Sequence, residues 1–301
     1  MLERRVGSAH GLLSAIERLW RDHSPYFFAA FVVTISSPGS ALAQPALTVP
    51  PPPFTLPFLP PISGDWALMV GGGGELKPDF EGAKRYTVSP VPSFSVRRAG
   101  SPERFRDPRD GAGIALIDFG GFRAGPVGKF KAERKSNSYA ELNGLRDIKF
   151  AVEIGGFAEY FPLDWFRTRV EARRGLGGHN GVVADFSADV IVPVLQRFSL
   201  SGGPRFTLEN TRATAPYFSI DAAQAAASGL PAFNAKGGAH SVGAGAQARY
   251  WLSPQWEVHS YIEYDRLLSD AAASPLVTLR GSPNQTAIGI GASNSFDVRI
   301  R

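Results

Sequence analysis

The sequence predicts an all-β protein, a transmembrane antiparallel up-and-down β-barrel of about twelve strands, although ten strands would also fit. Three observations predict this fold. The chain begins with the features of an export signal. Its body alternates apolar and polar residues in segments of about ten residues, and short and long connections separate these segments, as in bacterial outer-membrane barrels.

Composition narrows the function classes. The chain has 301 residues, 44% of them hydrophobic, with 33 Gly, 21 Phe and no Cys. Abundant glycine and aromatic residues suit a β-rich protein with many turns. The absence of cysteine excludes disulfides, thiolate metal sites and thiol nucleophiles. The net charge of +5 is spread along the chain and forms no basic run, so we expect neither nucleic-acid binding nor a cofactor.

The first 43 residues read as a cleaved signal peptide. Basic residues at 4, 5, 18 and 21 precede an apolar run over 26–35, and Ala41-Leu42-Ala43 places small residues at the two positions that a signal peptidase recognises. The run is too short to span a bilayer, which takes about 20 residues. We therefore expect cleavage after Ala43; an N-terminal amphipathic helix is the alternative. Residues 44–63 hold proline runs that predict a stiff periplasmic tether, and the barrel occupies 64–301.

Each predicted strand has one apolar and one polar face. In the segment 181–193, for example, Val182 and Phe186 share one face, and Asp185 and Asp189 share the other. No segment after the leader is apolar for the 18 residues that indicate a membrane-spanning helix. The predicted strands are 65–76, 87–98, 102–107, 111–118, 120–133, 148–161, 165–175, 181–193, 196–208, 236–251, 255–268 and 284–296.

The charged faces are expected to line the lumen, because a cation facing lipid at mid-bilayer costs about 2–4 kcal/mol. Mixed charges at this density predict a network of ion pairs, which either closes the barrel or lines a narrow polar channel. The predicted network consists of Glu153, Glu159, Arg167, Arg169, Glu171, Arg173, Asp185, Asp189, Glu257, Glu263 and Asp265.

The connections alternate in length. Short ones near 99–101, 119, 162–164, 194–195 and 252–254 are expected on the periplasmic side, where the tether lies. The outer loops are expected near 77–86, 108–110, 134–147, 176–180, 209–235 and 269–283, and the loop 209–235 contains an Ala-rich piece, 221–228, that can form a short helix.

Catalytic and metal-binding patterns are weak. His179 lies in a Gly-Gly-His-Asn-Gly sequence, where Asn-Gly is a hairpin signal by itself, so a turn role is favoured over a ligand role. His240 and Ser241 are the only candidate base and nucleophile. Adjacent strand residues point to opposite faces, which argues against such a pair. No metal-ligand spacing appears, and we expect no enzyme.

Several short motifs over residues 64–296 resemble the MipA/OmpV family of outer-membrane proteins. They include Lys77-Pro78-Asp79-Phe80-Glu81-Gly82, where Phe80 replaces the usual Tyr, and Val88-Ser89-Pro90-Val91-Pro92. The most specific piece runs from Tyr264 to Gln285, and Phe296 fills the place of the family's terminal aromatic, although 297–301 follow it. The motif residues carried over are Tyr264, Asp265, Asp270, Ser274, Pro275, Gly281, Asn284 and Gln285.

The resemblance implies an outer-membrane protein in contact with lipid. It further implies a scaffold in murein (peptidoglycan) turnover, whose partners would be a lytic transglycosylase and a murein synthase. A narrow porin-like channel for small solutes is the alternative, and a lipid-active enzyme using His240 and Ser241 is a remote one.

Overall fold

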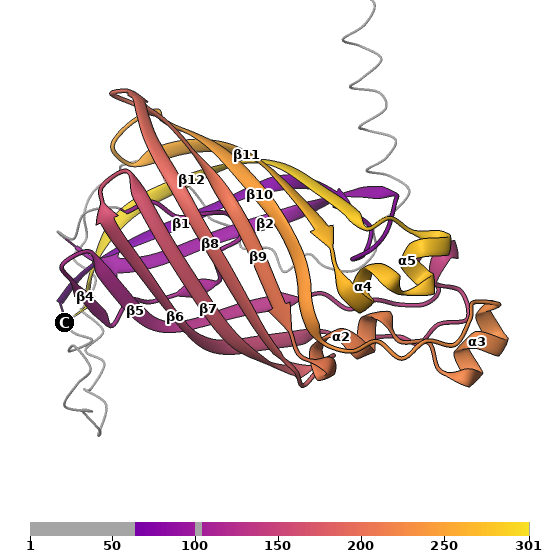
Figure 1. The fold of residues 1–301 in the computed structure, drawn as a ribbon. Helices are drawn as coiled ribbons and strands as arrows, with labels where there is room; N and C mark the ends of the chain where they lie inside the picture. The colour runs from indigo at the N-terminus through magenta and orange to yellow at the C-terminus, as the bar shows by residue number, and fades with distance from the viewer. Residues whose placement is uncertain (1–63, 100–103, 301) are drawn as a thin grey trace, which may run out of the picture. The chain divides into compact units, whose positions relative to one another are not determined.

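A computed structural model describes residues 64–99 and 104–300, and these residues form an antiparallel β-barrel (Figure 1). The twelve strands follow the order β2-β1-β12-β11-β10-β9-β8-β7-β6-β5-β3, with β4 also paired to β5, so the predicted up-and-down barrel is confirmed. Ten strands are long and β3 and β4 are short. The strands are β1 (Gly64–Pro78), β2 (Tyr86–Arg98), β3 (Ala112–Gly113), β4 (Ile117–Phe119), β5 (Phe122–Lys131), β6 (Ala151–Leu163), β7 (Phe166–Gly177), β8 (Val182–Leu195), β9 (Phe198–Glu209), β10 (Gly238–Trp251), β11 (Trp256–Leu267) and β12 (Asn284–Ile300).

The first and last strands pair with each other, with Gly64 opposite Ile300. We call this end of the barrel the termini end and the opposite end the cap end. The residues after Phe296 extend β12 along β1, and Arg299 Nε lies 2.7 Å from Asp65 Oδ1. The connections at the termini end are short (120–121, 164–165, 196–197 and 252–255), as predicted.

The outward side of the barrel is apolar. Val88 and Phe130, each 73% exposed, show how far these side chains lie from any protein core. Exposure of apolar side chains on one face of nearly every long strand is the pattern of a surface in contact with lipid. The tryptophans of the described part, Trp66, Trp165, Trp251 and Trp256, lie at the termini end, where an interfacial aromatic belt is expected. Within the described ranges, no helix combines the length and apolarity needed to cross a bilayer.

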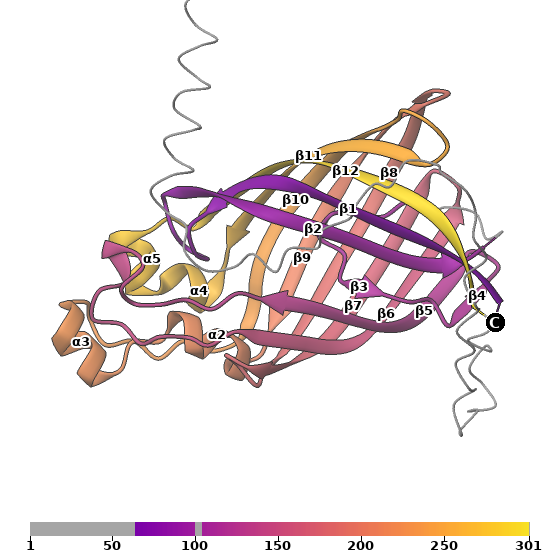
Figure 2. The same ribbon diagram turned by 180° about the vertical axis from the view of Figure 1, so that it is seen from behind.

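Two predicted strands are wrong. Residues 104–111 form no strand, and the predicted strand 111–118 is reduced to β3 and β4; residues 102–103 lie outside the described part. Pro108 has no amide donor, and Gly111 and Gly113 favour an irregular path. This segment, 104–113, which we call the strap, runs along the inside of the barrel between β2 and β5 (Figure 2).

The strap closes the barrel where the strand ladder ends. β2 lies at one end of the strand order, and its Pro90 and Pro92 suit an edge strand because proline cannot donate to a neighbour. The guanidinium of Arg106 donates to the Phe94 carbonyl of β2, 2.5 Å away. On the other side, the Ile114 amide donates to the Pro126 carbonyl of β5. The strap therefore bridges both edges of the seam.

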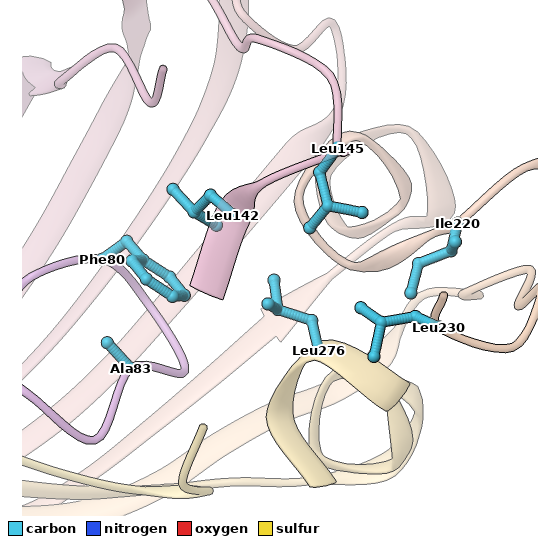
Figure 3. Packing of buried hydrophobic residues seen from close by; sticks show 7 residues of the cluster. All are labelled: Phe80, Ala83, Leu142, Leu145, Ile220, Leu230 and Leu276. Carbon is cyan, nitrogen blue, oxygen red and sulfur yellow. The ribbon is translucent and has the colours of Figure 1, made fainter. Parts of the chain in front are cut away.

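The cap end is covered by four long connections, 79–85, 132–150, 210–237 and 268–283, which carry η1 (Ala140–Leu142), α2 (Thr211–Phe218), α3 (Ala222–Ser228), α4 (Ser269–Ala273) and α5 (Pro275–Arg280) (Figure 1). The Ala-rich piece forms α3, with the Asp221 side chain accepting from the Gln224 amide at its N-terminus. The loops have a hydrophobic core of their own, shown in Figure 3: Phe80, Ala83, Leu142, Leu145, Ile220, Leu230 and Leu276. A second cluster, including Tyr217, Phe218, Leu267 and Val277, packs beside it.

Candidate functional site

The inward faces of β6 to β9 form a continuous charged wall. Arg167 is its centre and is fully buried. Its guanidinium Nη2 lies 2.6 Å from Asp110 Oδ2 and 2.8 Å from Glu159 Oε2, and Nη1 lies 3.3 Å from Asp189 Oδ2. One cation thus holds three carboxylates from three parts of the chain: the strap, β6 and β8.

The other arginines of β7 extend the wall toward the cap end. Arg169 lies 3.0 Å from Glu159 and 2.7 Å from Glu171. Arg173 lies 2.9 Å from Glu153 and 2.6 Å from Asp185, and it also pairs with Glu171. Because arginines alternate with apolar residues along β7, the period of two residues places all of them on the inner face.

The acidic residues of β11 lie across the lumen. Glu257 pairs with Arg249 of β10. Glu263 and Asp265 face Arg109 of the strap, at 3.5 and 2.6 Å. The structure therefore places all eleven residues of the expected lumen network inside the barrel and brings those of β6 to β8 into one connected cluster.

The strap supplies charges that the sequence reasoning missed. Asp107 lies 2.6 Å from Arg205 of β9, which was also missed and lies 2.7 Å from Asp189. Asp110 and Arg109 complete the contacts to Arg167 and Asp265, and the Gly111 amide donates to Glu171 Oε1 at 3.0 Å. A signal was present: the sequence Asp-Pro-Arg-Asp followed by two nearby glycines has the composition of a turn rather than of a strand.

The space left beside the strap is small. A cavity of about 30 Å³ lies among Asp107, Arg169, Asp185 and Thr207. This volume is about the share of one water molecule in the liquid. The charged half of the lumen is thus filled by side chains and the strap.

A second polar cluster lies under the cap and consists of Glu81, Lys131, Glu209 and His240; we call it the latch cluster. His240 Nε2 lies 2.5 Å from Glu81 Oε1, and Nδ1 lies 3.3 Å from Glu209 Oε2. Lys131 Nζ lies 3.0 Å from Glu81 and 3.9 Å from Glu209. Burial alone would raise the pKa of Glu81, but Lys131 and His240 lower this pKa well below its usual range. The cluster connects a cap loop to β5, β9 and β10.

The latch cluster fits a metal ion poorly. Glu81, Glu209 and His240 offer ligand atoms within 4.8 Å of one another. The two carboxylates, however, face opposite nitrogens of one imidazole ring, so a single ion cannot replace both contacts. Lys131 already supplies positive charge to both carboxylates. An ion-pair cluster that fastens the cap explains the geometry without a metal.

His240 and Ser241 differ from the expectation that they point to opposite faces. A β-bulge between Ala239 and Ser241 inserts an extra residue, and both side chains are buried. The two ring nitrogens of His240 face carboxylates, which leaves none directed at Ser241 as a general base. His179 is buried in its turn; Nε2 lies 3.1 Å from Glu153 Oε1, and Nδ1 accepts from the Gly181 amide.

Most residues of the late motif build the cap. Ser274 is fully buried and its hydroxyl donates to the Phe218 carbonyl at 2.8 Å. Gln285 accepts from the Gly82 amide and donates to the Ser282 carbonyl, and Asp270 accepts from the Lys236 amide. Pro275 starts α5, and a side chain at Gly281 would lie 1.9 Å from the Gly82 carbonyl oxygen.

The remaining motif residues belong to the strands. Tyr264 points outward and donates to Asn284, whereas Asp265 points into the lumen. The expected cleavage residues Ala41 and Ala43 lie outside the described residues.

Comparisons with known proteins agree with this architecture. Three solved structures illustrate the similar folds. The NanC porin is 10% identical, with a TM-score of 0.37, over 75% of this chain and 98% of that one. An outer-membrane channel from Pseudomonas putida F1 is 8% identical, with a TM-score of 0.40, over 78% and 96%. OmpT of Vibrio cholerae is 8% identical, with a TM-score of 0.34, over 77% and 97%.

Sequence comparison is more specific. No curated protein sequence matches the chain. The family described as MltA-interacting protein MipA matches residues 70–296, which include every long strand of the barrel. The chain therefore belongs to the MipA family of outer-membrane β-barrels.

Proposed function

We propose that this protein is a closed outer-membrane barrel that acts as a scaffold in murein turnover rather than as a channel or an enzyme. The observation that carries the proposal is the strap: three of its charged side chains are paired to opposite walls of the lumen. A barrel filled in this way leaves its surfaces as the functional parts. The name of the family, MltA-interacting protein, supports a lytic transglycosylase as one partner and, through it, a murein synthase.

The termini end is the surface that we assign to these partners. Both described ends of the chain and all the short turns lie there. In our proposal, cleavage after Ala43 leaves residues 44–63 as a periplasmic tether beside these turns. The absence of a free base at His240 supports a non-enzymatic role.

A binding experiment tests the scaffold. Full-length protein in detergent is immobilised and offered a purified lytic transglycosylase and a bifunctional murein synthase. We expect saturable binding that charge reversal at the exposed turn residue Arg197 weakens and charge reversal at Lys236 of the cap does not. Absence of binding at low salt would contradict the scaffold role.

A narrow channel is the second candidate, and one observation favours it. The inward residues of β1 and β2 are small, and Gly71, Gly73 and Ser93 keep partial solvent exposure. Planar-bilayer recording separates the candidates: we expect no discrete conductance steps from folded protein. Regular steps would instead establish a path along this glycine–serine wall.

A further inference from the structure

One arginine lies on the lipid-facing side of the barrel. Arg174 of β7 is opposite Ile154 of β6 and Val182 of β8, both of which are exposed apolar residues, while its neighbour Arg173 points into the lumen. Arg174 is exposed, and no carboxylate of the described residues pairs with it. A cation on this face is costly in hydrocarbon and tolerated near the interface. Its position three residues before the end of β7 therefore indicates headgroup level.

An apolar strip lies on the same flank of the barrel. Phe130 and Phe150 stack with ring centroids 5.8 Å apart, and both are exposed. Ile154, Leu176 and Val182 extend the strip along β6 to β8, each about half exposed. The strip offers contact area for acyl chains directly beside the Arg174 guanidinium.

A groove of about 860 Å³ opens in the cap above this flank. Its wall includes the turn after β7, from Gly177 to Asn180, and Arg212 of α2. The groove is continuous with the strip, because the Val182 amide donates to Asn210, the residue that precedes α2. Arg212 is exposed and has no carboxylate partner within the described ranges, so the groove carries a free cation.

The other outward arginine near the cap end provides a contrast. Arg266 lies on β11, and its guanidinium donates to Asn284 at 2.9 Å, an oxygen that also accepts from Tyr264. It does not line the groove. Arg174 therefore differs from Arg266 in being both unpaired and adjacent to the groove.

We infer that the flank formed by β6, β7 and β8 binds a phosphorylated glycolipid of the cap-side leaflet. Its acyl chains lie on the apolar strip, a phosphate contacts Arg174, and its saccharide extends into the groove toward Arg212. Charge complementarity selects an anionic headgroup, and the depth of the groove selects one larger than a phospholipid headgroup. The site faces away from the termini end, so it is independent of the proposed scaffold role.

Native mass spectrometry of the full-length protein in detergent tests this inference, with diphosphoryl lipid A as the probe. We expect one tightly bound lipid, with affinity reduced about tenfold or more in R174Q and further in R174Q/R212Q, because each loses a charge-assisted bond. The matched control R266Q should bind as the unchanged protein does. Heat-modifiable gel mobility confirms that each variant is folded.

Three results would overturn the inference. Equal losses in R174Q and R266Q would indicate a general charge effect. Phosphatidylglycerol binding as tightly as lipid A would indicate an unspecific anionic surface. Displacement of lipid A by millimolar inorganic phosphate would indicate a site for the free anion. Conversely, removing the phosphates from the probe should weaken its binding to the unchanged protein and not to R174Q.

Discussion

Replacing Arg167 with methionine removes the centre of the charged wall while keeping a side chain of similar length. In the native barrel this guanidinium pairs with Asp110, Glu159 and Asp189, and it is fully buried. The variant leaves these carboxylates in place in an interior from which water is largely excluded.

The expected cost follows from what remains. Breaking one buried ion pair typically costs about 3–5 kcal/mol, because the partner charge is left uncompensated. Here each carboxylate keeps a second cation: Glu159 keeps Arg169 and Arg123, Asp189 keeps Arg205, and Asp110 keeps Arg169 at 3.5 Å. We therefore expect a loss near the lower end of this range, about 3 kcal/mol.

Urea unfolding of the refolded barrel measures this loss. Tryptophan fluorescence follows the barrel, because the described tryptophans lie at the termini end. With a slope of about 2–3 kcal/mol per molar urea, the midpoint should fall by roughly 1–1.5 M. The exposed Arg197→Met variant should stay within about 0.5 kcal/mol of the unchanged protein.

A double-mutant cycle with Glu159→Gln completes the test. Because Arg167 and Glu159 are in direct contact, their effects should be non-additive by about 1–3 kcal/mol. Additive effects, or an unchanged midpoint for Arg167→Met, would refute the interpretation that the ion pairs hold the lumen together.

The remaining predictions concern the cap. Replacing His240 with glutamine should loosen α2 by about 1–3 kcal/mol, seen as faster hydrogen exchange there, because two carboxylates lose their shared partner; His259→Gln is the control and should leave α2 unchanged. The pKa of Glu81 is lowered in the folded state, so its stabilisation is complete above its ordinary value of 4.5 and is lost as the pH falls through the lowered value. Hydrogen exchange of the cap, corrected for intrinsic rates, should therefore be constant from pH 7 to about 5 and accelerate in stronger acid, and a Glu81→Gln variant that kept the acid response would contradict this assignment. Alanine at Gly281 would place its Cβ 1.9 Å from a backbone oxygen and should cost about 1–3 kcal/mol in thermal unfolding, whereas alanine at Gly74, with nothing within 4 Å, should be nearly neutral.

The long strands were predictable because a membrane barrel makes strong demands on their pattern. Every second residue must tolerate lipid, so the alternation of Val182 and Phe186 with Asp185 and Asp189 settles which face is inward. The ion-pair partners of Arg167 were less predictable. Their choice depends on register between strands, which the sequence of one strand does not contain.

The strap and the bulge at His240 escaped prediction for different reasons. The strap alternates weakly and contains turn residues, and the assumption of regular strands outweighed this evidence. The bulge depends on long-range contacts: His240 turns inward because Glu81 and Glu209 lie there, and these residues are 159 and 31 positions away in the chain. Local pattern rules assume unbroken alternation and miss such positions.

The position of the strap also bears on how the barrel works. A plug that only fills a lumen can leave it, but this strap is part of the wall, since it contacts the edges of both β2 and β5. Its departure would expose unpaired backbone groups of both strands to lipid, at several kcal/mol for each group. Opening the lumen would thus break the barrel, and a structure of this kind favours stable outer surfaces over conduction. The termini-end turns and the cap groove are therefore the places where partners should be sought.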